Sequence, residues 1–250
     1  MALILKSSAQ IAKMREAGRL VAQTHAMLRE YVVPGAVLIE LDQLVEEYLR
    51  EHNATSPFKN YRGTFPASIC ASLNDVICHG IPDKTRLRDG DIIAIDIGAF
   101  LDGWHGDSCV TYAVGKIDAE GQKLMKVTEE AMWRGIAQAR AGQTLGDIGA
   151  AIQEFVEAQG FSVVREYTGH GIGRKMHEEP TVLHYGERGR GMRLRAGTVL
   201  TVEPMVNVGK PQTKLLKDGW TVKTVDGKRS AQFEHAVAIT DGDPEILTVL

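Results

Sequence analysis

Cysteine is scarce in this chain. The 250 residues include three cysteines, Cys70, Cys78 and Cys109, and no CxxC pair. Three thiols cannot form the disulfide framework of a small secreted protein, and their simplest interpretation is reduced thiols in a cytoplasmic protein. The apolar run Ala2–Leu5 is also too short for the core of a signal peptide. We therefore expect a cytoplasmic location.

Long hydrophobic runs and an excess of charge of one sign are missing as well. No stretch approaches the roughly 20 apolar residues that a membrane helix needs. The 29 basic residues are scattered, the net charge is −3 and aromatic residues make up 6%. A protein that binds nucleic acid by bulk electrostatics would need a basic surface. We expect no membrane association and no direct nucleic-acid partner.

What the chain does contain is an internal repeat. Residues 87–96, LRDGDIIAID, match residues 194–203, LRAGTVLTVE, at an offset of 107 residues. Each segment has the pattern of a turn, then a buried strand, then a carboxylate. The same offset relates two amphipathic helical patterns that begin near Leu38 and Leu145. Two half-units of similar structure are therefore expected.

A further match, between 107–115 and 234–242, has an offset of 127 residues. The 20 additional residues fit the Gly-, Lys-, Asp- and Thr-rich stretch 209–230, which we interpret as an added hairpin or long loop.

The repeat predicts the domain organisation. We expect a single catalytic domain over 1–250, with pseudo-symmetric halves at about 9–115 and 118–242 and a shared site between them. No Pro-, Gly- or Ser-rich linker separates these halves.

Local signals predict the elements of each half. Ser7 with Gln10 resembles a helix capping box, and Thr144 with Asp147 resembles another helix start. Val- and Ile-rich strands are predicted at 91–99, 107–114, 198–206 and 233–240. The expected fold class is α+β, a repeated helix-helix-strand-strand unit with an antiparallel sheet covered by helices.

Four carboxylates occupy repeat-equivalent positions beside apolar strands: Asp96, Asp107, Glu203 and Glu234. A charge in such a place is costly unless it is paired or binds a metal. Convergence of four acids would raise their pKa values by mutual repulsion, and two divalent cations would neutralise the four charges. We therefore expect two bridged metal ions.

Histidine narrows the choice of metal. His170 lies between two glycines, His177 follows seven residues later, and His79 is in the other half. Oxygen ligands with imidazole suit Mn, Fe, Co or Zn. For His105, two residues before Asp107, both a place near the metal site and a purely structural role stay open. Structural roles are expected for His25, His52, His184 and His235.

Together, several segments resemble type I methionine aminopeptidases, and the match spans almost the whole chain. The segments are Cys78–Pro82, Asp91–Asp96, His105–Asp107, Gly169–Gly173, His177–Pro180, Glu203–Met205, Asp218–Thr221 and Ser230–His235. The chain resembles the short bacterial form of the family. The resemblance implies the pita-bread fold. It also implies metal ligands at Asp96, Asp107, His170, Glu203 and Glu234, with Asp107 and Glu234 bridging the two ions.

The resemblance also implies an activity: removal of the initiator methionine from nascent chains or short peptides when the second residue is small, by attack of a metal-bridging water on the first peptide bond. Glu203 would shuttle the proton, His177 would stabilise the oxyanion and His79 would contact the scissile amide. The implied methionine pocket comprises Phe58, Tyr61, Phe65, Cys70 and Trp220, together with the two histidines.

Further implications concern partners and a second ion. Relatives suggest a Na or K ion near Asn74, Val76 and Ser230. Action on nascent chains would bring the protein to the ribosome, and a monomer is the default expectation. Two departures from the family pattern, an additional Thr64 and Met176 before His177, concern the shape of the substrate pocket.

Two rival functions share the expected fold. Prolidases and aminopeptidases P usually carry a large N-terminal domain, and only about 90 residues precede Asp91 here. A catalytically inactive binding protein would typically have lost metal ligands, whereas all five are present. Fold alone would not separate these functions, but the intact ligand set favours the aminopeptidase.

Overall fold

The computed structural model describes residues 3–250. The first half contains α1 (Ser8–Leu28), α2 (Leu38–Glu51), the short helix η1 (Tyr61–Gly63), β1 (Ile69–Leu73), β2 (Val76–Cys78), β3 (Ile92–Leu101) and β4 (Trp104–Ala113). The second half contains α3 (Ala119–Gln138), α4 (Leu145–Ala158), β5 (Ser162–Val163), β6 (Gly169–Gly171), β7 (Glu178–Val182), β8 (Val199–Val202), β9 (Met205–Asn207), β10 (Thr213–Leu215), β11 (Val222–Thr224), β12 (Ser230–Gln232), β13 (His235–Ala238) and β14 (Glu245–Ile246).

Two of the helices begin at the predicted capping boxes. Ser7 Oγ accepts a hydrogen bond from the backbone N–H of Gln10, and Gln10 Oε1 accepts one from the backbone N–H of Ser7. Thr144 and Asp147 form the equivalent pair at the start of α4. Each box satisfies backbone N–H groups that a helix start would otherwise leave free. The sequence signals for these two helix starts are confirmed.

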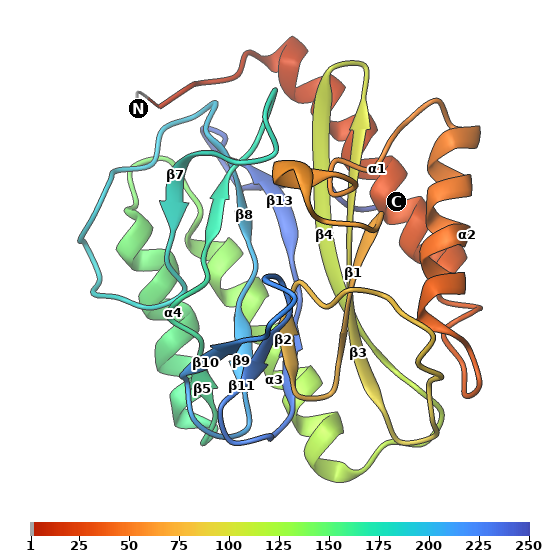
Figure 1. The fold of residues 1–250 in the computed structure, drawn as a ribbon. Helices are drawn as coiled ribbons and strands as arrows, with labels where there is room; N and C mark the ends of the chain where they lie inside the picture. The colour runs from red at the N-terminus through yellow and green to blue at the C-terminus, as the bar shows by residue number, and fades with distance from the viewer. Residues whose placement is uncertain (1–2) are drawn as a thin grey trace.

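The strands form antiparallel sheets between layers of helices. One sheet has the order β1-β3-β4, and another has the order β14-β13-β8-β6-β7. In Figure 1 the β3–β4 hairpin and the β8 and β13 strands run through the middle, with α2 on one side and α4 on the other. Backbone hydrogen bonding from Glu234 to Cys109, at 2.9 Å, joins the two sheets at the centre. The predicted α+β class is confirmed, with helices outside and the sheets inside.

Two smaller sheets complete the fold. The order β12-β9-β5 lies in the second half, whereas β10-β11-β2 joins the two halves. The stretch 209–230 thus contains the predicted hairpin, and β11 of that hairpin pairs with β2 of the first half.

Two predicted strands are wrong in their extent. The strand expected over 198–206 is interrupted at Glu203 and Pro204, so that β8 and β9 belong to different sheets. Proline has no N–H to donate to a strand ladder, which explains the break. The strand expected over 233–240 begins at His235, after a break at Phe233 and Glu234. Both breaks release a carboxylate from the ladder.

The remaining two predicted strands form one long hairpin. β3 and β4 are in register from Ile92 opposite Ala113 to Leu101 opposite Trp104. Asp102 and Gly103 close the hairpin with φ angles of 48° and 81°. Positive φ at both central positions matches the right-handed twist of the flanking strands.

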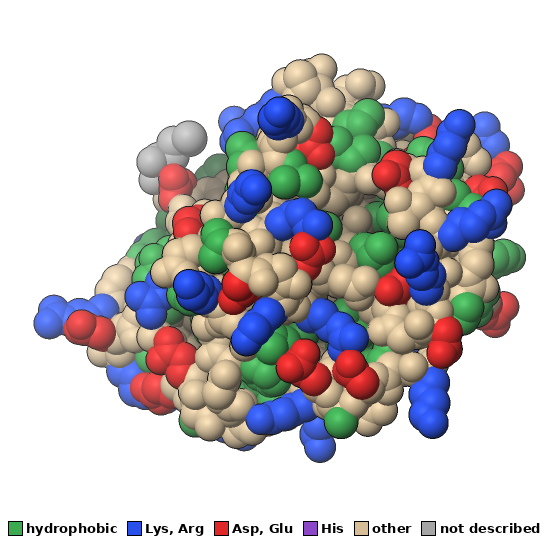
Figure 2. Space-filling view, turned by 60° about the horizontal axis from the view of Figure 1, so that its bottom comes forward, with side chains coloured by type: hydrophobic (Ala, Val, Ile, Leu, Met, Phe, Trp, Pro, Cys, Tyr) green, Lys and Arg blue, Asp and Glu red, His purple; other side chains and the backbone are tan. Residues whose placement is uncertain are grey.

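All three cysteines are buried and free. Within residues 3–250 no helix is both long and apolar enough to cross a membrane. On the face that Figure 2 shows, Lys and Arg side chains are interspersed with Asp and Glu, without a continuous basic surface.

Candidate active site

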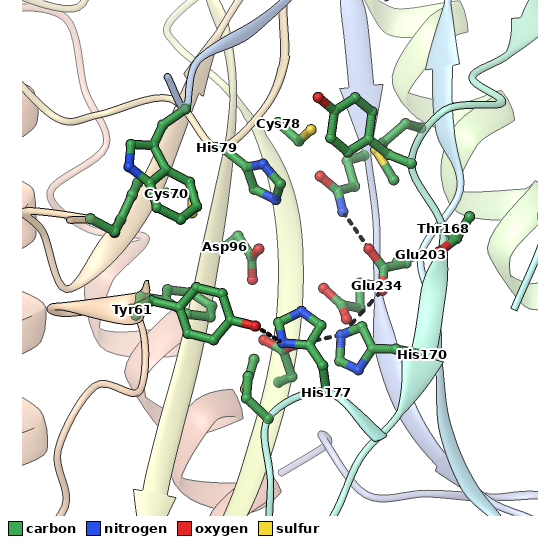
Figure 3. Close-up of a pocket in the computed structure, with 18 of the residues that line it drawn as sticks. Tyr61, Cys70, Cys78, His79, Asp96, Thr168, His170, His177, Glu203 and Glu234 are labelled. Carbon is green, nitrogen blue, oxygen red and sulfur yellow. Dashed lines mark hydrogen bonds and ion pairs between the residues drawn. The ribbon is translucent and has the colours of Figure 1, made fainter. Parts of the chain in front are cut away.

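The two halves enclose a cavity of about 350 Å³. Side chains from both halves point into it, with His79 and Asp96 on one side and His170 and Glu203 on the other (Figure 3). Every predicted metal ligand and every predicted pocket residue lines this cavity: Phe58, Tyr61, Phe65, Cys70, His79, Asp96, Asp107, His170, His177, Glu203, Trp220 and Glu234. The structure therefore brings together all twelve predicted catalytic, metal and pocket residues.

Strand register explains how the first two acids meet. Asp96 on β3 is paired with Cys109 on β4, and Asp107 is paired with Gly98. Residues two apart on a strand point to the same face, so both carboxylates leave the hairpin on one side. The hairpin thus presents two acids to the second half.

The acids of the second half sit at the end of a strand ladder. β8 and β13 pair up to Val202 opposite His235. Glu203 follows β8 and Glu234 precedes β13, so both lie just beyond the last pair. His170 on the neighbouring β6 donates its backbone N–H to Thr201 Oγ1 at 2.9 Å. Three potential ligands therefore gather at one sheet end.

The side-chain geometry fits a divalent cation. Ligand atoms of Asp107, His170 and Glu234 lie within 4.8 Å of one another. His170 Nε2 is 3.6 Å from Asp107 Oδ2 and 3.6 Å from Glu203 Oε1. Buried oxygens of Asp96, Asp107 and Glu234 have no hydrogen-bond partner among the described residues. Buried polar atoms are rarely left unpartnered, and cations satisfy such oxygens.

Burial and mutual repulsion disfavour negative charge here. Burial, followed by the neighbouring Asp107, raises the pKa of Asp96 well above its usual value. Burial also raises the pKa of Asp107, and burial with the charges of Asp107 and Glu203 raises the pKa of Glu234. The pKa of Glu203 rises to about 8, mainly through burial. A site of this kind binds protons when it lacks cations.

Both carboxyl oxygens of Glu203 have a side-chain hydrogen-bond donor. Thr201 Oγ1 donates to Glu203 Oε1 at 2.7 Å, and Gln232 Nε2 donates to Glu203 Oε2 at 3.4 Å. The backbone N–H of Glu203 donates to His184 Nε2 at 3.1 Å. These contacts fix the position of the carboxyl group.

Two histidines, His79 and His177, line the same cavity as the acids. Burial, then the nearby His170, lowers the pKa of His177 to about 3. Burial, then Arg62, lowers the pKa of His79 to about 4. Both rings are therefore neutral hydrogen-bonding groups near pH 7.

An aromatic wall completes the cavity. The Trp220 ring centroid lies 5.2 Å from that of Phe65 and 6.3 Å from that of His79, both edge-on. Tyr61 also packs on His177, with ring centroids 5.2 Å apart. An apolar, partly aromatic space next to a polar cluster is typical of a small-ligand site.

Comparison with known proteins identifies this arrangement. The model of metallopeptidase family M24 matches residues 12–241. The chain is 50% identical over 246 residues to methionine aminopeptidase 1 of Bacillus subtilis, covering 98% of this chain and 99% of that protein. The chain belongs to metallopeptidase family M24, among the short bacterial methionine aminopeptidases.

Solved structures agree with this assignment. The methionine aminopeptidase from Rickettsia prowazekii superposes with a TM-score of 0.98 at 45% identity, covering 99% of this chain and 100% of that chain. The prolidase from Pyrococcus horikoshii is 20% identical with a TM-score of 0.78, covering 98% of this chain and 63% of that one, and this likeness shows the fold alone. The predicted pita-bread fold of the M24 enzymes is confirmed.

The remaining predicted residues separate into two groups. The five histidines assigned to the scaffold or left open do not line the M24 cavity: His25, His52, His105, His184 and His235. His105 Nδ1 hydrogen-bonds the Gly173 carbonyl, and His235 hydrogen-bonds Thr248.

The residues of the predicted monovalent-cation site lie close together. The Asn74 carbonyl accepts a hydrogen bond from the Ser230 N–H at 2.9 Å, and Val76 begins β2 two residues after Asn74. That cation stays a prediction.

Several residues in or next to the cavity have no role predicted from the sequence. Gln232, which lines the cavity, and Thr201, which lies behind it, both hydrogen-bond the Glu203 carboxyl group. Each lies two residues from a predicted ligand along the chain, and this spacing is the signal that could have identified them. Tyr167 packs edge-on against His79, with ring centroids 5.5 Å apart. Arg62 and Glu166 also line the cavity, and no comparable sequence pattern marks them. Met176 is buried and lines the cavity, so this departure from the family pattern does contribute to the shape of the pocket.

Proposed function

We propose that this protein removes the N-terminal methionine from nascent chains and short peptides whose second residue is small. The observation that carries the proposal is the cavity itself: four carboxylates and a histidine beneath an aromatic wall, in a chain similar along its whole length to methionine aminopeptidases. Methionine is an unbranched apolar side chain, and the wall of Phe58, Phe65 and Trp220 offers it apolar surface.

The five candidate ligands would hold two divalent ions. Asp96, Asp107, His170, Glu203 and Glu234 provide oxygen atoms and one imidazole, which suits Fe, Mn, Co or Zn. Two divalent ions match the four carboxylate charges, and Asp107 and Glu234 would bridge the ions. When bound, such ions polarise the scissile carbonyl and lower the pKa of water.

Glu203 is suited to move a proton. Its carboxyl group lines the cavity beside His170, and a carboxyl group there can accept and donate a proton. Thr201 and Gln232 keep the carboxyl group in place during the transfer. In our proposal, Glu203 accepts a proton from the attacking water and delivers it to the departing amine.

His177 is suited to donate a hydrogen bond to the oxyanion. Its Nδ1 lies 2.8 Å from the hydroxyl of Tyr61. If the phenol donates to Nδ1, the neutral ring carries its proton on Nε2, where it can donate to substrate. His79, held edge-on by Tyr167 and Trp220, would contact the scissile amide.

Organisation and location follow as further proposals. We expect a monomer with one domain over 1–250, a cytoplasmic location and action on nascent chains at the ribosome. A Na or K ion beside Asn74, Val76 and Ser230 would stabilise the turn between β1 and β2.

A peptide assay tests the function directly. Metal-free protein is incubated anaerobically with Met-Ala-Ser, Met-Leu-Ser and an X-Pro peptide while Mn, Fe(II), Co or Zn is added. We expect metal-dependent release of methionine from Met-Ala-Ser only, and loss of that release in Glu203→Gln. Cleavage of the X-Pro peptide alone would move the protein to prolidase-type chemistry, and metal binding without any cleavage would indicate a binding protein.

A further inference from the structure

A buried ion pair lies next to the site and takes no part in the proposed chemistry. Lys6 Nζ is 2.6 Å from Glu178 Oε2, and the two side chains are only 2% and 5% exposed. Within residues 3–250 it is the one Lys or Arg pair with both partners so deeply buried. Burying such a pair costs desolvation energy, so stability alone is a weak reason for its presence.

Lys6 is fixed on the segment that precedes α1. Its backbone N–H donates to the Gly197 carbonyl at 2.7 Å, and its ammonium also donates to the Ile4 carbonyl at 3.2 Å. Gly173 leaves room for the pair, because a Cβ there would lie 2.7 Å from Lys6 Cε and 2.8 Å from Glu178 Oε1. The ammonium therefore occupies a fitted position.

Glu178, the partner of Lys6, is adjacent to the backbone of both His177 and His170. It directly follows His177 in the chain and begins β7. Across the strand pair it lies opposite Gly171, the residue after His170, at an irregularity in register. The ring centroids of His170 and His177 are 4.1 Å apart. One carboxylate thus anchors the backbone that carries the two rings.

We infer that Lys6 is a positioning residue, which holds His177 and His170 in their working places by pairing with Glu178. The inference rests on the proposed function for its kinetic consequence. Catalytic groups lose much of their effect when displaced by as little as about 1 Å, and the pair with Lys6 is the one buried ion pair among the described contacts of Glu178. Without the ammonium, the Glu178 carboxylate would keep its hydrogen bond from the Lys175 N–H, at 3.1 Å, but would lose its charged partner, and we expect the backbone beside His177 to shift.

The test separates positioning from stabilisation. We compare Lys6→Met, Glu178→Gln and the double variant, with Lys6→Arg as the conservative variant. Arg134→Met is the matched control, because it removes the half-exposed pair with Glu130 in the second half. For each metal-loaded protein, the melting temperature, kcat and KM for Met-Ala-Ser are measured. Histidine imidazole NMR signals are recorded as a readout independent of activity.

Each single variant leaves one buried charge unpaired, so we expect a lower melting temperature and a lower kcat. Removing both charges should restore the melting temperature, because neutral partners can replace a buried pair. The double variant should still keep kcat at least about tenfold below wild type, with a smaller change in KM and shifted signals of His170 and His177. Lys6→Arg should retain most of kcat. Arg134→Met, which also loses the stacking of Arg134 on Phe155 at 4.1 Å, should leave kcat and the histidine signals unchanged.

Recovery of both kcat and melting temperature in the double variant would overturn the inference, since the pair would then only stabilise the fold. Unchanged histidine signals in the double variant would overturn it as well. Should Lys6→Met fail to fold, the double variant and Lys6→Arg still decide the question. Wild-type cleavage of Met-Ala-Ser tests the proposed function separately, because the histidine signals report the positions of the rings even in an inactive chain.

Discussion

The hydroxyl of Tyr61 lies 2.8 Å from Nδ1 of His177, although the two residues are 116 positions apart in the chain. The contact joins η1 of the first half to the loop before β7 of the second half. When the phenol donates to Nδ1, the proton of the neutral ring lies on Nε2, which is the nitrogen that would donate to substrate in the proposed function.

Removal of that hydroxyl should slow catalysis without unfolding the protein. We expect Tyr61→Phe to reduce kcat about fivefold, the equivalent of one ordinary hydrogen bond, because the His177 tautomer is then no longer fixed. Steady-state kinetics with Met-Ala-Ser measure the effect. Tyr31→Phe, at an exposed tyrosine beyond the end of α1, serves as the control and should leave kcat unchanged. An unaltered kcat in Tyr61→Phe would mean that the contact does not set the tautomer.

Replacement of the Glu203 carboxyl group should reduce kcat more than removal of the Tyr61 hydroxyl does. Glu203→Gln keeps the size of the side chain and an acceptor for Thr201, but it cannot transfer a proton and it removes one of the charged candidate metal ligands. We expect kcat to fall by roughly 10²- to 10⁴-fold while circular dichroism stays that of the wild type. Glu166→Gln changes another carboxylate that lines the same cavity and should have a far smaller effect. Equal losses in the two variants would argue against a specific role for Glu203.

Metal binding should release protons near neutral pH. The raised pKa of Glu203, about 8, and the raised pKa values of Asp96, Asp107 and Glu234 mean that the metal-free site carries protons at pH 7. Ligands must lose these protons to bind a cation, so the affinity for Mn should increase with pH. Titration calorimetry in two buffers of different ionisation enthalpy measures the number released. Glu203→Gln should release fewer protons, and a heat of binding independent of buffer would contradict the expectation.

A buried histidine outside the site should make stability depend on pH. His25 hydrogen-bonds the Tyr112 hydroxyl and the Ser108 carbonyl, and burial lowers its pKa from 6.5 to about 4. The unfolded chain binds this proton more readily, so the contribution of His25 is complete above pH 6.5 and is lost as the pH falls toward 4. The difference corresponds to about 3 kcal/mol.

Urea unfolding of the metal-free protein at pH 7 and pH 4 tests this expectation. His25→Gln, which stays neutral, should lose less stability between the two pH values than the wild type does. His52→Gln, at an exposed histidine, should behave like the wild type. The same loss in His25→Gln and in the wild type would place the pH dependence elsewhere.

Much of the site could be predicted because its chemistry is local in the sequence. Asp96 and Glu203 each follow an apolar run, and the offset of 107 residues between them already pointed to a shared centre. Such carboxylates stand out since burial of an unpaired charge is costly. The breaks at Pro204 and before His235 were missed, because apolar patterning does not show where a ladder ends.

The sequence by itself determined the helix starts at Ser7 and Thr144, the repeat at an offset of 107 residues, and the carboxylate and imidazole side chains that line the cavity. These features depend on periodicity, capping and residue chemistry, which act over a few neighbouring positions. Only the tertiary structure decided that Tyr61 meets His177, that Lys6 meets Glu178, and that β11 crosses to pair with β2. Such contacts join residues more than 100 positions apart, and their geometry depends on how the two halves pack rather than on any local pattern.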